Sequence, residues 1–151
     1  MKYWLPALCL LLLCSCDKPK DPEVDCSLYD PFFSNLLIEL VDDQGENLIE
    51  NNTYPADEIT INYKGNISTN VVFNDVPGLE NLISMNLFGD AGENTFILNL
   101  SDTVSDTLVL NLSIDIPVCN IPLYTLNTAT YNGEVQSIIT ENGTYRITVV
   151  K

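Results

Sequence analysis

The side chains best suited to chemistry in this sequence are its cysteines. The chain has five of them and no histidine, so it lacks the residues for a Ser-His-Asp or Cys-His arrangement. Cys16 stands directly after Leu13-Cys14-Ser15, at the end of an apolar run. A thiol is a nucleophile, and small neighbours leave the peptide bond before Cys16 open to an enzyme. The pattern favours a cysteine that is modified over one that catalyses a reaction.

Residues 1–15 have the organisation of a signal peptide. Lys2 supplies a positive charge, and an apolar run extends from Leu5 to Leu13, broken only by Pro6. The run is shorter than the roughly 20 residues of a transmembrane helix. Leu13-Cys14-Ser15-Cys16 resembles the lipobox of bacterial lipoproteins, which implies cleavage before Cys16 and anchoring to a membrane through lipid on Cys16. An ordinary secretory signal and a retained transmembrane anchor are the alternatives.

After such a cleavage, with lipid on Cys16, two cysteines remain that carry no lipid, Cys26 and Cys119. Two thiols in an exported protein can form one disulfide. The bond would close a loop of roughly 90 residues, worth about 4 kcal/mol of stability in the chain-entropy model. Two unpaired thiols are the alternative, because a sequence does not show whether the side chains come within bonding distance.

The chain is strongly acidic, which excludes one large class of partners. Removal of Lys2 with the signal peptide leaves five basic against 21 acidic side chains, a net charge of −16. Such a polyanion repels a phosphate backbone, so we expect no nucleic-acid partner. It also repels anionic lipid headgroups. We interpret the charge as a means of solubility at a crowded surface in preference to cation binding.

Carboxylates are the remaining candidates for a site. A glycosidase needs only two, but no pair stands out and a small domain has little room for a deep cleft, so we expect no enzyme. The loops from Asp42 to Asn47 and from Asp90 to Asn94 carry the oxygens that calcium prefers. Neither has the EF-hand spacing, and Asp, Asn and Gly also form ordinary turns. We therefore predict turns there, with no metal ion and no cofactor.

Two threonines stand in a short pattern associated with modification. Asp102-Thr103-Val104 and Asp106-Thr107-Leu108 resemble the Asp-Ser/Thr-aliphatic signal for O-glycosylation of exported proteins in Bacteroidota. Both copies lie in one predicted hairpin. The resemblance implies O-glycosylation of Thr103 and Thr107, with chance occurrence of a short motif as the alternative.

The elements that must carry these residues are β-strands. Apolar and polar side chains alternate, which gives each strand one apolar and one polar face. Asn132-Gly133 and Asn142-Gly143 predict tight hairpins. No segment has a sustained helical period. The alternation predicts strands over 36–40, 59–64, 83–87, 96–100, 108–115 and 145–150, with two more near 67–73 and 134–139.

These strands predict one all-β domain over residues 26–151. Short strands at this spacing are typical of an antiparallel, Ig-like β-sandwich, with a small β-barrel as the alternative. Within the segment 108–115, we expect one face to point into the core, namely Leu108, Leu110, Leu112 and Ile114. Residues 16–25, rich in proline and charge, predict a flexible tether between the lipid anchor and this domain.

Further segments resemble small β-sandwich lipoproteins of Bacteroidota. The likeness lies in Phe33 to Ile61, Asp106-Thr107-Leu108, Tyr131-Asn132-Gly133-Glu134 and Ile147-Thr148-Val149-Val150-Lys151. It covers most of the mature chain and implies a cell-envelope location, on the outer membrane, without a catalytic residue. The segment 17–21 departs from the acidic export signal of surface lipoproteins in that group. The periplasmic face and the cell surface therefore both stay open.

Two functional hypotheses follow. The first is a binding or accessory module that contacts a glycan, a protein partner or an outer-membrane complex. The second is a structural coat component without a discrete ligand. Aromatic side chains exposed in the loops would favour the first, although core packing is their usual role. The candidates are Tyr29, Phe32, Phe33, Tyr54, Tyr124 and Tyr131.

Overall fold

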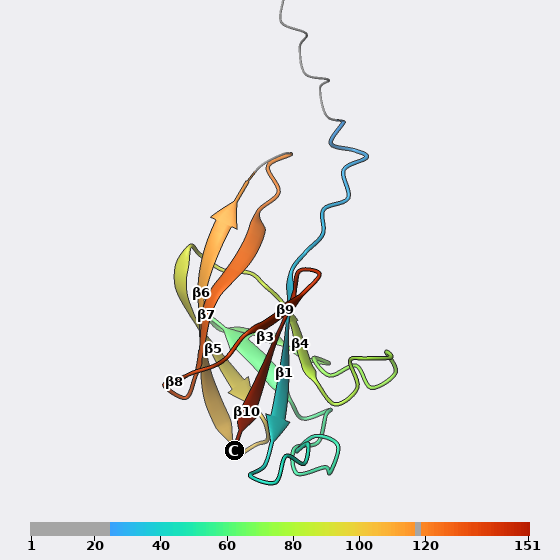
Figure 1. Ribbon diagram of the computed structural model, residues 1–151, viewed down its shortest axis with the longest axis vertical. Coiled ribbons are helices and arrows are strands. Elements are labelled where there is room, and N and C mark those ends of the chain that lie inside the picture. The colour runs from blue at the N-terminus through green and yellow to red at the C-terminus, as the bar shows by residue number, and fades with distance from the viewer. Residues whose placement is uncertain (1–24, 117–118) are drawn as a thin grey trace, which may run out of the picture.

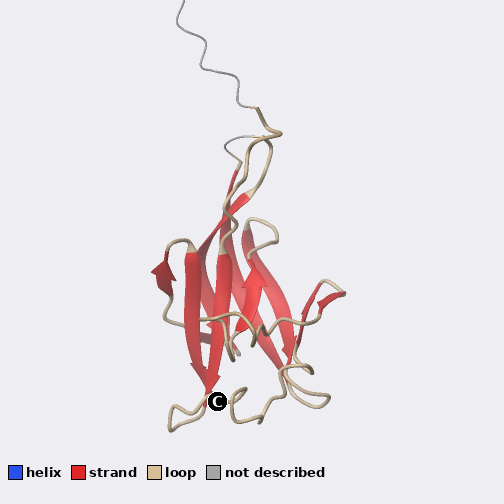
Figure 2. Cartoon of the chain, turned by 90° about the vertical axis from the view of Figure 1, so that its right-hand side faces the viewer, coloured by secondary structure: helices blue, strands red, loops and turns tan. Residues whose placement is uncertain are grey.

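The computed structural model describes residues 25–116 and 119–151. The predicted signal peptide, the predicted lipidation site Cys16 and the predicted tether up to residue 24 lie outside these residues. Within them the chain forms ten β-strands and no helix (Figure 2). The part of the chain that the structure describes thus has no helix long and apolar enough to cross a membrane. The all-β class predicted from the alternation is confirmed.

The strands form two sheets with the apolar core between them, as a β-sandwich does (Figure 1). The first sheet has the order β4-β1-β10-β9, with β1 at Asn35–Val41, β4 at Ile83–Asn86, β9 at Ile139–Glu141 and β10 at Thr144–Val150. The second has the order β3-β2-β5-β6-β7-β8, with β2 at Thr60–Tyr63, β3 at Asn66–Ser68, β5 at Gly92–Asn99, β6 at Ser105–Asp115, β7 at Leu123–Tyr131 and β8 at Glu134–Val135.

One strand pair differs from the antiparallel arrangement expected. β1 and β10 run parallel, in a register that places Leu37 beside Arg146 and Glu39 beside Thr148. A tight hairpin cannot join parallel strands, so the pair must form between segments far apart in the sequence. The alternation within each strand carries no signal for that choice. The pairing brings the beginning and the end of the domain together at the centre of the four-stranded sheet.

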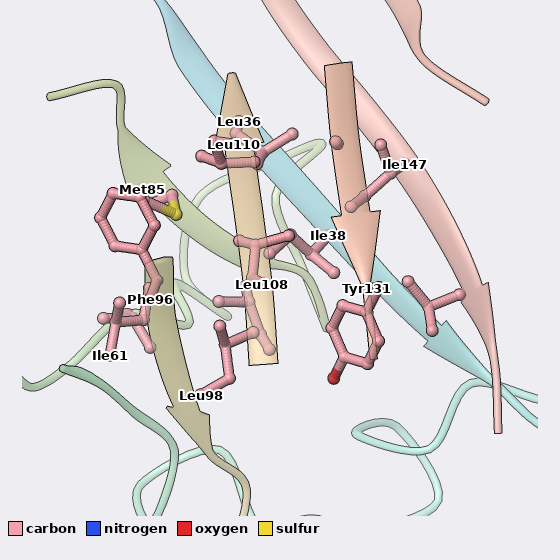
Figure 3. Close-up of a cluster of buried hydrophobic side chains, with 14 of the residues drawn as sticks. Leu36, Ile38, Ile61, Met85, Phe96, Leu98, Leu108, Leu110, Tyr131 and Ile147 are labelled. Carbon is pink, nitrogen blue, oxygen red and sulfur yellow. The ribbon is translucent and has the colours of Figure 1, made fainter. Parts of the chain in front are cut away.

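The core consists of the inward faces predicted by the alternation (Figure 3). In β6, Leu108, Leu110 and Leu112 are buried, as expected. Ile114 is only half-buried, because β6 and β7 extend there beyond the end of the four-stranded sheet (Figure 1). The buried partners of β6 across the core include Leu36, Ile38, Leu40, Ile147 and Val149.

β7 has no counterpart among the predicted strands. Its pairing with β6 shifts register between Asn111 and Leu112, so Asn127 is an extra residue in a β-bulge. The buried residues Leu126 and Ala129 are therefore three positions apart instead of two. The bulged Asn127 amide donates to Asn111 Oδ1 at 3.0 Å and to Ser113 Oγ at 2.8 Å. The bulge thus interrupts the two-residue alternation by which the other strands were predicted.

Two predicted strands are wrong in extent. The segment 67–73 holds only the end of β3 and an isolated bridge between Val72 and Ile83. The segment 134–139 divides into β8 and the start of β9, which belong to different sheets. Between them the Gln136 N–H donates to the Ala129 carbonyl and Ile138 packs against the core. The chain therefore crosses from one sheet to the other where one strand was expected.

The predicted hairpins at Asn132-Gly133 and Asn142-Gly143 are present. Both residues of each pair have positive φ, 48° and 88° in the first and 48° and 77° in the second. Such angles define a type I′ turn, whose twist matches that of the flanking strands. The same geometry occurs at Lys64-Gly65, which joins β2 to β3.

Candidate functional site

A groove lies on the outer face of the four-stranded sheet. Its floor is made by side chains of β1, β10 and β9 that share one face because they are paired in register. Leu37, Arg146 and Ile139 form one row across the three strands, and two further pairs flank it, Glu39 with Thr148 and Thr144 with Glu141. We call this surface the outer groove. It encloses about 580 Å³ and is open to solvent.

One wall of the outer groove comes from the loop that precedes β4. Gly78 of this loop lines the groove. The Asn81 N–H donates to Asn74 Oδ1 at 2.9 Å, which braces the loop internally. The Asn47 amide donates to the Asn81 carbonyl at 3.1 Å and ties the loop to the segment after β1. These bonds hold the wall in place although it contains no strand.

The charges in the outer groove are organised around Arg146, the only arginine in the chain. Its Nη2 lies 2.9 Å from Glu39 Oε2, and the same carboxylate oxygen accepts the Thr148 hydroxyl at 3.0 Å. Both charged side chains remain partly exposed, at 43% and 24%. Within the described residues, the contact with Glu39 is an ion pair and the Arg146 guanidinium donates no hydrogen bond to the protein, so its N–H groups are available at the open groove that it lines.

An exposed aromatic ring packs on the hairpin that borders the outer groove. Phe32 is 64% exposed and packs over Gly143, beside the groove residue Asn142. A Cβ atom on Gly143 would come within 2.5 Å of Phe32 Cε1, so the ring occupies the space that the glycine leaves. Gly143 also needs its positive φ for the turn. The hairpin glycine therefore positions the ring next to the outer groove.

A second polar cluster joins the two sheets near their opposite end. Asp106 at the start of β6 accepts hydrogen bonds from the Tyr131 hydroxyl at 2.7 Å and the Asn132 amide at 2.8 Å. Lys151, directly after β10, forms an ion pair with the same carboxylate, and its ammonium lies over the Tyr54 ring. Asp106 is only 7% exposed, so this cluster is a satisfied buried network.

The protonation of this cluster follows from its contacts. Burial opposes the charge on Asp106, but hydrogen bonds from Lys151, Asn132 and Tyr131 outweigh it and hold the pKa of the carboxyl below its ordinary value. Burial, together with the neighbouring carboxylate, raises the pKa of Tyr131 far above its usual value. Asp106 is therefore ionised and Tyr131 neutral at neutral pH, which suits a structural role.

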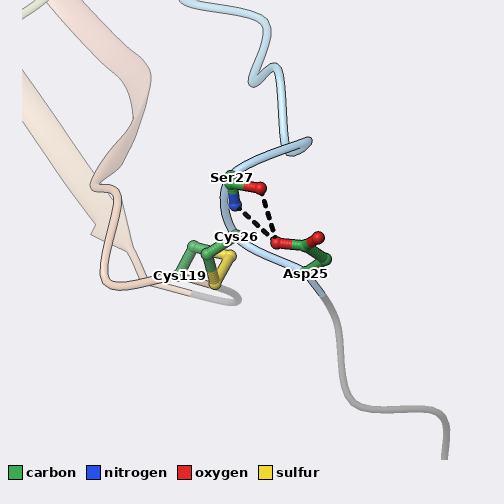
Figure 4. Close-up of a disulfide and its surroundings, with 4 residues drawn as sticks. All are labelled: Asp25, Cys26, Ser27 and Cys119. Carbon is green, nitrogen blue, oxygen red and sulfur yellow. Dashed lines mark hydrogen bonds between the residues drawn. A yellow bond between two sulfur atoms is a disulfide. The ribbon is translucent and has the colours of Figure 1, made fainter.

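The structure brings Cys26 and Cys119 together as a disulfide, with a Cα–Cα distance of 5.4 Å (Figure 4). The bond joins the segment before β1 to the connection between β6 and β7. Beside it, Ser27 donates through its hydroxyl and its backbone N–H to Asp25 Oδ1, at 2.7 and 2.9 Å. These bonds lower the pKa of the Asp25 carboxyl.

The two acidic loops have local hydrogen-bond partners. Asp42 Oδ1 accepts the backbone N–H groups of Gln44 and Glu46, both at 2.9 Å, as in an ordinary turn. In the other loop, Asp90 pairs with Lys64 at 2.6 Å. The buried Asn94 bonds to the backbone of its own loop. No group of three or more His, Cys, Asp or Glu side chains suited to a metal ion occurs in residues 25–116 and 119–151.

The two threonines of the glycosylation motif lie in different settings. Thr103 is exposed in the loop between β5 and β6. Thr107 is half-buried within β6, and its backbone N–H donates to Asn132 Oδ1 at 2.8 Å. Its motif neighbours Asp106 and Leu108 are both buried. The folded domain therefore presents the first motif to solvent and encloses the flanks of the second.

The six aromatic candidates divide by exposure. Phe32 and Phe33 are exposed, whereas Tyr29, Tyr54 and Tyr124 are half-buried and Tyr131 belongs to the core. Of these six, Phe32 contacts the hairpin that borders the outer groove, at Gly143. The groove residues themselves were not recognised as a site from the sequence. In the sequence, the groove residues of β1 and β10 are the outward-facing positions of the alternation. They form one surface only because these two strands pair side by side.

Comparison with protein-family models, with curated proteins and with solved structures finds no match.

Proposed function

We propose that the protein is a lipid-anchored component of the bacterial cell envelope, held on the outer membrane through Cys16, and that its β-sandwich is a non-catalytic binding module. The outer groove carries the binding part of this proposal. It combines an open hollow of about 580 Å³, a partly exposed Arg146–Glu39 pair and two apolar side chains, Leu37 and Ile139. Ligand sites are typically concave surfaces of this size with a few placed polar groups.

The anchoring part rests on the N-terminal sequence. An apolar run of signal-peptide length ends in Leu13-Cys14-Ser15-Cys16, and a charged, proline-containing segment follows. The described chain begins at one end of the sandwich, opposite the end that carries Lys151 (Figure 1). The outer groove lies on a side face between these ends. In this arrangement an anchor before residue 25 leaves the groove open to a glycan or an envelope protein.

Fractionation of cells tests the anchor. Cys16→Ala removes the thiol that would carry the lipid, so the variant should leave the membrane fraction or accumulate unprocessed. Cys14→Ala is the matched control, because this neighbouring cysteine would depart with the signal peptide. A Cys16→Ala protein that is processed and fractionates with membranes like the wild type would disprove the anchor.

Cross-linking in intact cells tests the binding module. A photoactivatable diazirine residue replaces Ile139 in the outer groove, and the control carries it at Thr125, which is exposed on the six-stranded sheet. We expect a defined mass increase from position 139 and none from position 125. Equal labelling at both positions, or none at either, would instead favour a structural coat component without a ligand.

A further inference from the structure

We infer that the outer groove takes a neutral glycan chain. This inference rests on the proposed binding function and names the ligand class of the same site. It follows from three properties of the described residues: the mixture of hydrogen-bond donors and acceptors, the state of the charges, and the apolar groups that border them.

The first property is a mixed set of donors and acceptors on one open surface. Arg146 offers N–H donors that bond to no acceptor in the described part of the protein, and the carboxylate of Glu141 offers acceptors. Within the described residues, the side chains of Glu141, Asn142 and Thr144 make no hydrogen bond to the protein, so they are free to bind a ligand. A hydroxyl group both donates and accepts, so a polyhydroxylated ligand satisfies this set.

The second property is the charge. Three basic side chains occur in the described residues, and each forms an ion pair: Lys64 with Asp90, Arg146 with Glu39 and Lys151 with Asp106. No unpaired cation therefore remains in that part of the chain to attract an anion. Glu141 leaves the groove one negative charge in excess, which repels phosphates and carboxylates. An anionic ligand is disfavoured.

The third property is the apolar border. Ile139 is 58% exposed and lies in the row next to Arg146, and Phe32 presents its ring on the hairpin that borders the groove. The C–H face of a sugar ring can pack on such groups while its hydroxyls reach the polar floor. A basic peptide could pair one cation with the single excess charge of Glu141, but its further cations would lie near the Arg146 guanidinium, which repels them.

Calorimetric titration of the mature lipoprotein in detergent tests the inference. The probes are neutral hexasaccharides of glucose, mannose and xylose in α- and β-linkage, hexagalacturonate as an anion, and hexalysine as a basic peptide. We expect at least one neutral hexasaccharide to bind, and the two charged probes to bind more weakly. Binding of a charged probe in preference to every neutral one would overturn the glycan assignment.

Variants locate the binding. Arg146→Gln with Glu39→Gln removes both charges of the pair, and Phe32→Ala removes only the exposed ring, so the second variant remains informative if the first does not fold. Each should weaken hexasaccharide binding at least tenfold, whereas Thr125→Ala on the other sheet should not change it. Unchanged binding in Phe32→Ala and in a folded double variant would overturn the assignment to this groove.

The two levels of the proposal fail separately. A cross-link from position 139 without binding of any neutral hexasaccharide would support the binding module but contradict a neutral glycan as its ligand. Absence of both the cross-link and hexasaccharide binding would contradict the binding module as well.

Discussion

The ammonium group of Lys151 pairs with the carboxylate of Asp106 and so connects the end of β10 to the beginning of β6. Because these strands belong to different sheets, the pair ties the two sheets together at one end of the sandwich. The Lys151 backbone N–H also donates to the Val41 carbonyl at 2.9 Å, which fixes the direction of the side chain. The two side chains are only 16% and 8% exposed, so this pair differs from an ordinary surface ion pair.

Removal of this cation should be costly. Lys151→Met keeps much of the side-chain volume but leaves the Asp106 charge without its ammonium, and we expect the free energy of unfolding to fall by about 3 kcal/mol. Lys64→Met is the control, because its pair with Asp90 is largely exposed and screened by solvent, so its loss should have little effect on stability. Urea denaturation at neutral pH measures both. Equal losses of unfolding free energy in the two variants would show that the buried pair stabilises the protein no more than the exposed pair.

The same cluster predicts a pH dependence. The pKa of Asp106 is lowered in the folded state, so the folded chain binds this proton less readily than the unfolded chain. The stabilisation is complete above the unfolded pKa of about 3.9 and is lost as pH falls through the lower folded value. Asp106→Asn should therefore destabilise the protein at pH 7 and flatten the loss of stability below about pH 4. A parallel acid profile in the wild type and the variant would contradict this assignment.

The register of β6 predicts opposite outcomes at adjacent residues. Leu110 is fully buried, so Leu110→Asp removes packing and places a charge in the core, at a cost of several kcal/mol. Asn111→Asp should be nearly silent, since a carboxylate still accepts the hydrogen bond from the Asn127 amide at Asn111 Oδ1. Thermal unfolding followed by circular dichroism distinguishes the two. Similar melting temperatures would refute the register.

The disulfide predicts both a mass and a stability difference. Protein isolated from cells without reductant should have a mass two hydrogens below that of the reduced chain, and Cys26 and Cys119 should resist alkylation. Replacing both with serine opens a loop with a sequence separation of 93 and should lower the free energy of unfolding by about 4 kcal/mol in the chain-entropy model. Ready alkylation of both thiols in native, unreduced protein would show that the disulfide is absent.

The settings of Thr103 and Thr107 predict unequal modification if a folded domain is the substrate of an O-glycosyltransferase. Thr103 is exposed, whereas the motif of Thr107 has both neighbours buried. Thr103→Ala should then remove a glycan-sized mass from protein isolated from cells, and Thr107→Ala should not. A glycan on Thr107 would indicate modification before folding. Wild-type protein with the mass of the unmodified mature chain would remove both sites.

The sequence predicted the inward faces better than the pairing of strands. Alternation in β1, β6 and β10 is a local property, and the residues expected in the core, such as Leu36, Leu108 and Ile147, are buried. β7 escaped detection because the bulge at Asn127 breaks its period. The outer groove was not predictable in the same way. Its central contact joins Glu39 to Arg146, and these meet only through the parallel pairing of β1 with β10.

The cross-link between Cys26 and Cys119 also determines how the domain would withstand tension. The segment before β1 leaves the sandwich roughly along the strands, so a pull on it acts as shear along the ladder of β1 and its neighbours (Figure 1). The covalent bond diverts part of that pull into the connection between β6 and β7, and hence into the other sheet. Mechanical load arriving through residue 25 is thereby shared between both layers of the sandwich, and extraction of β1 alone would not release the domain from its attachment.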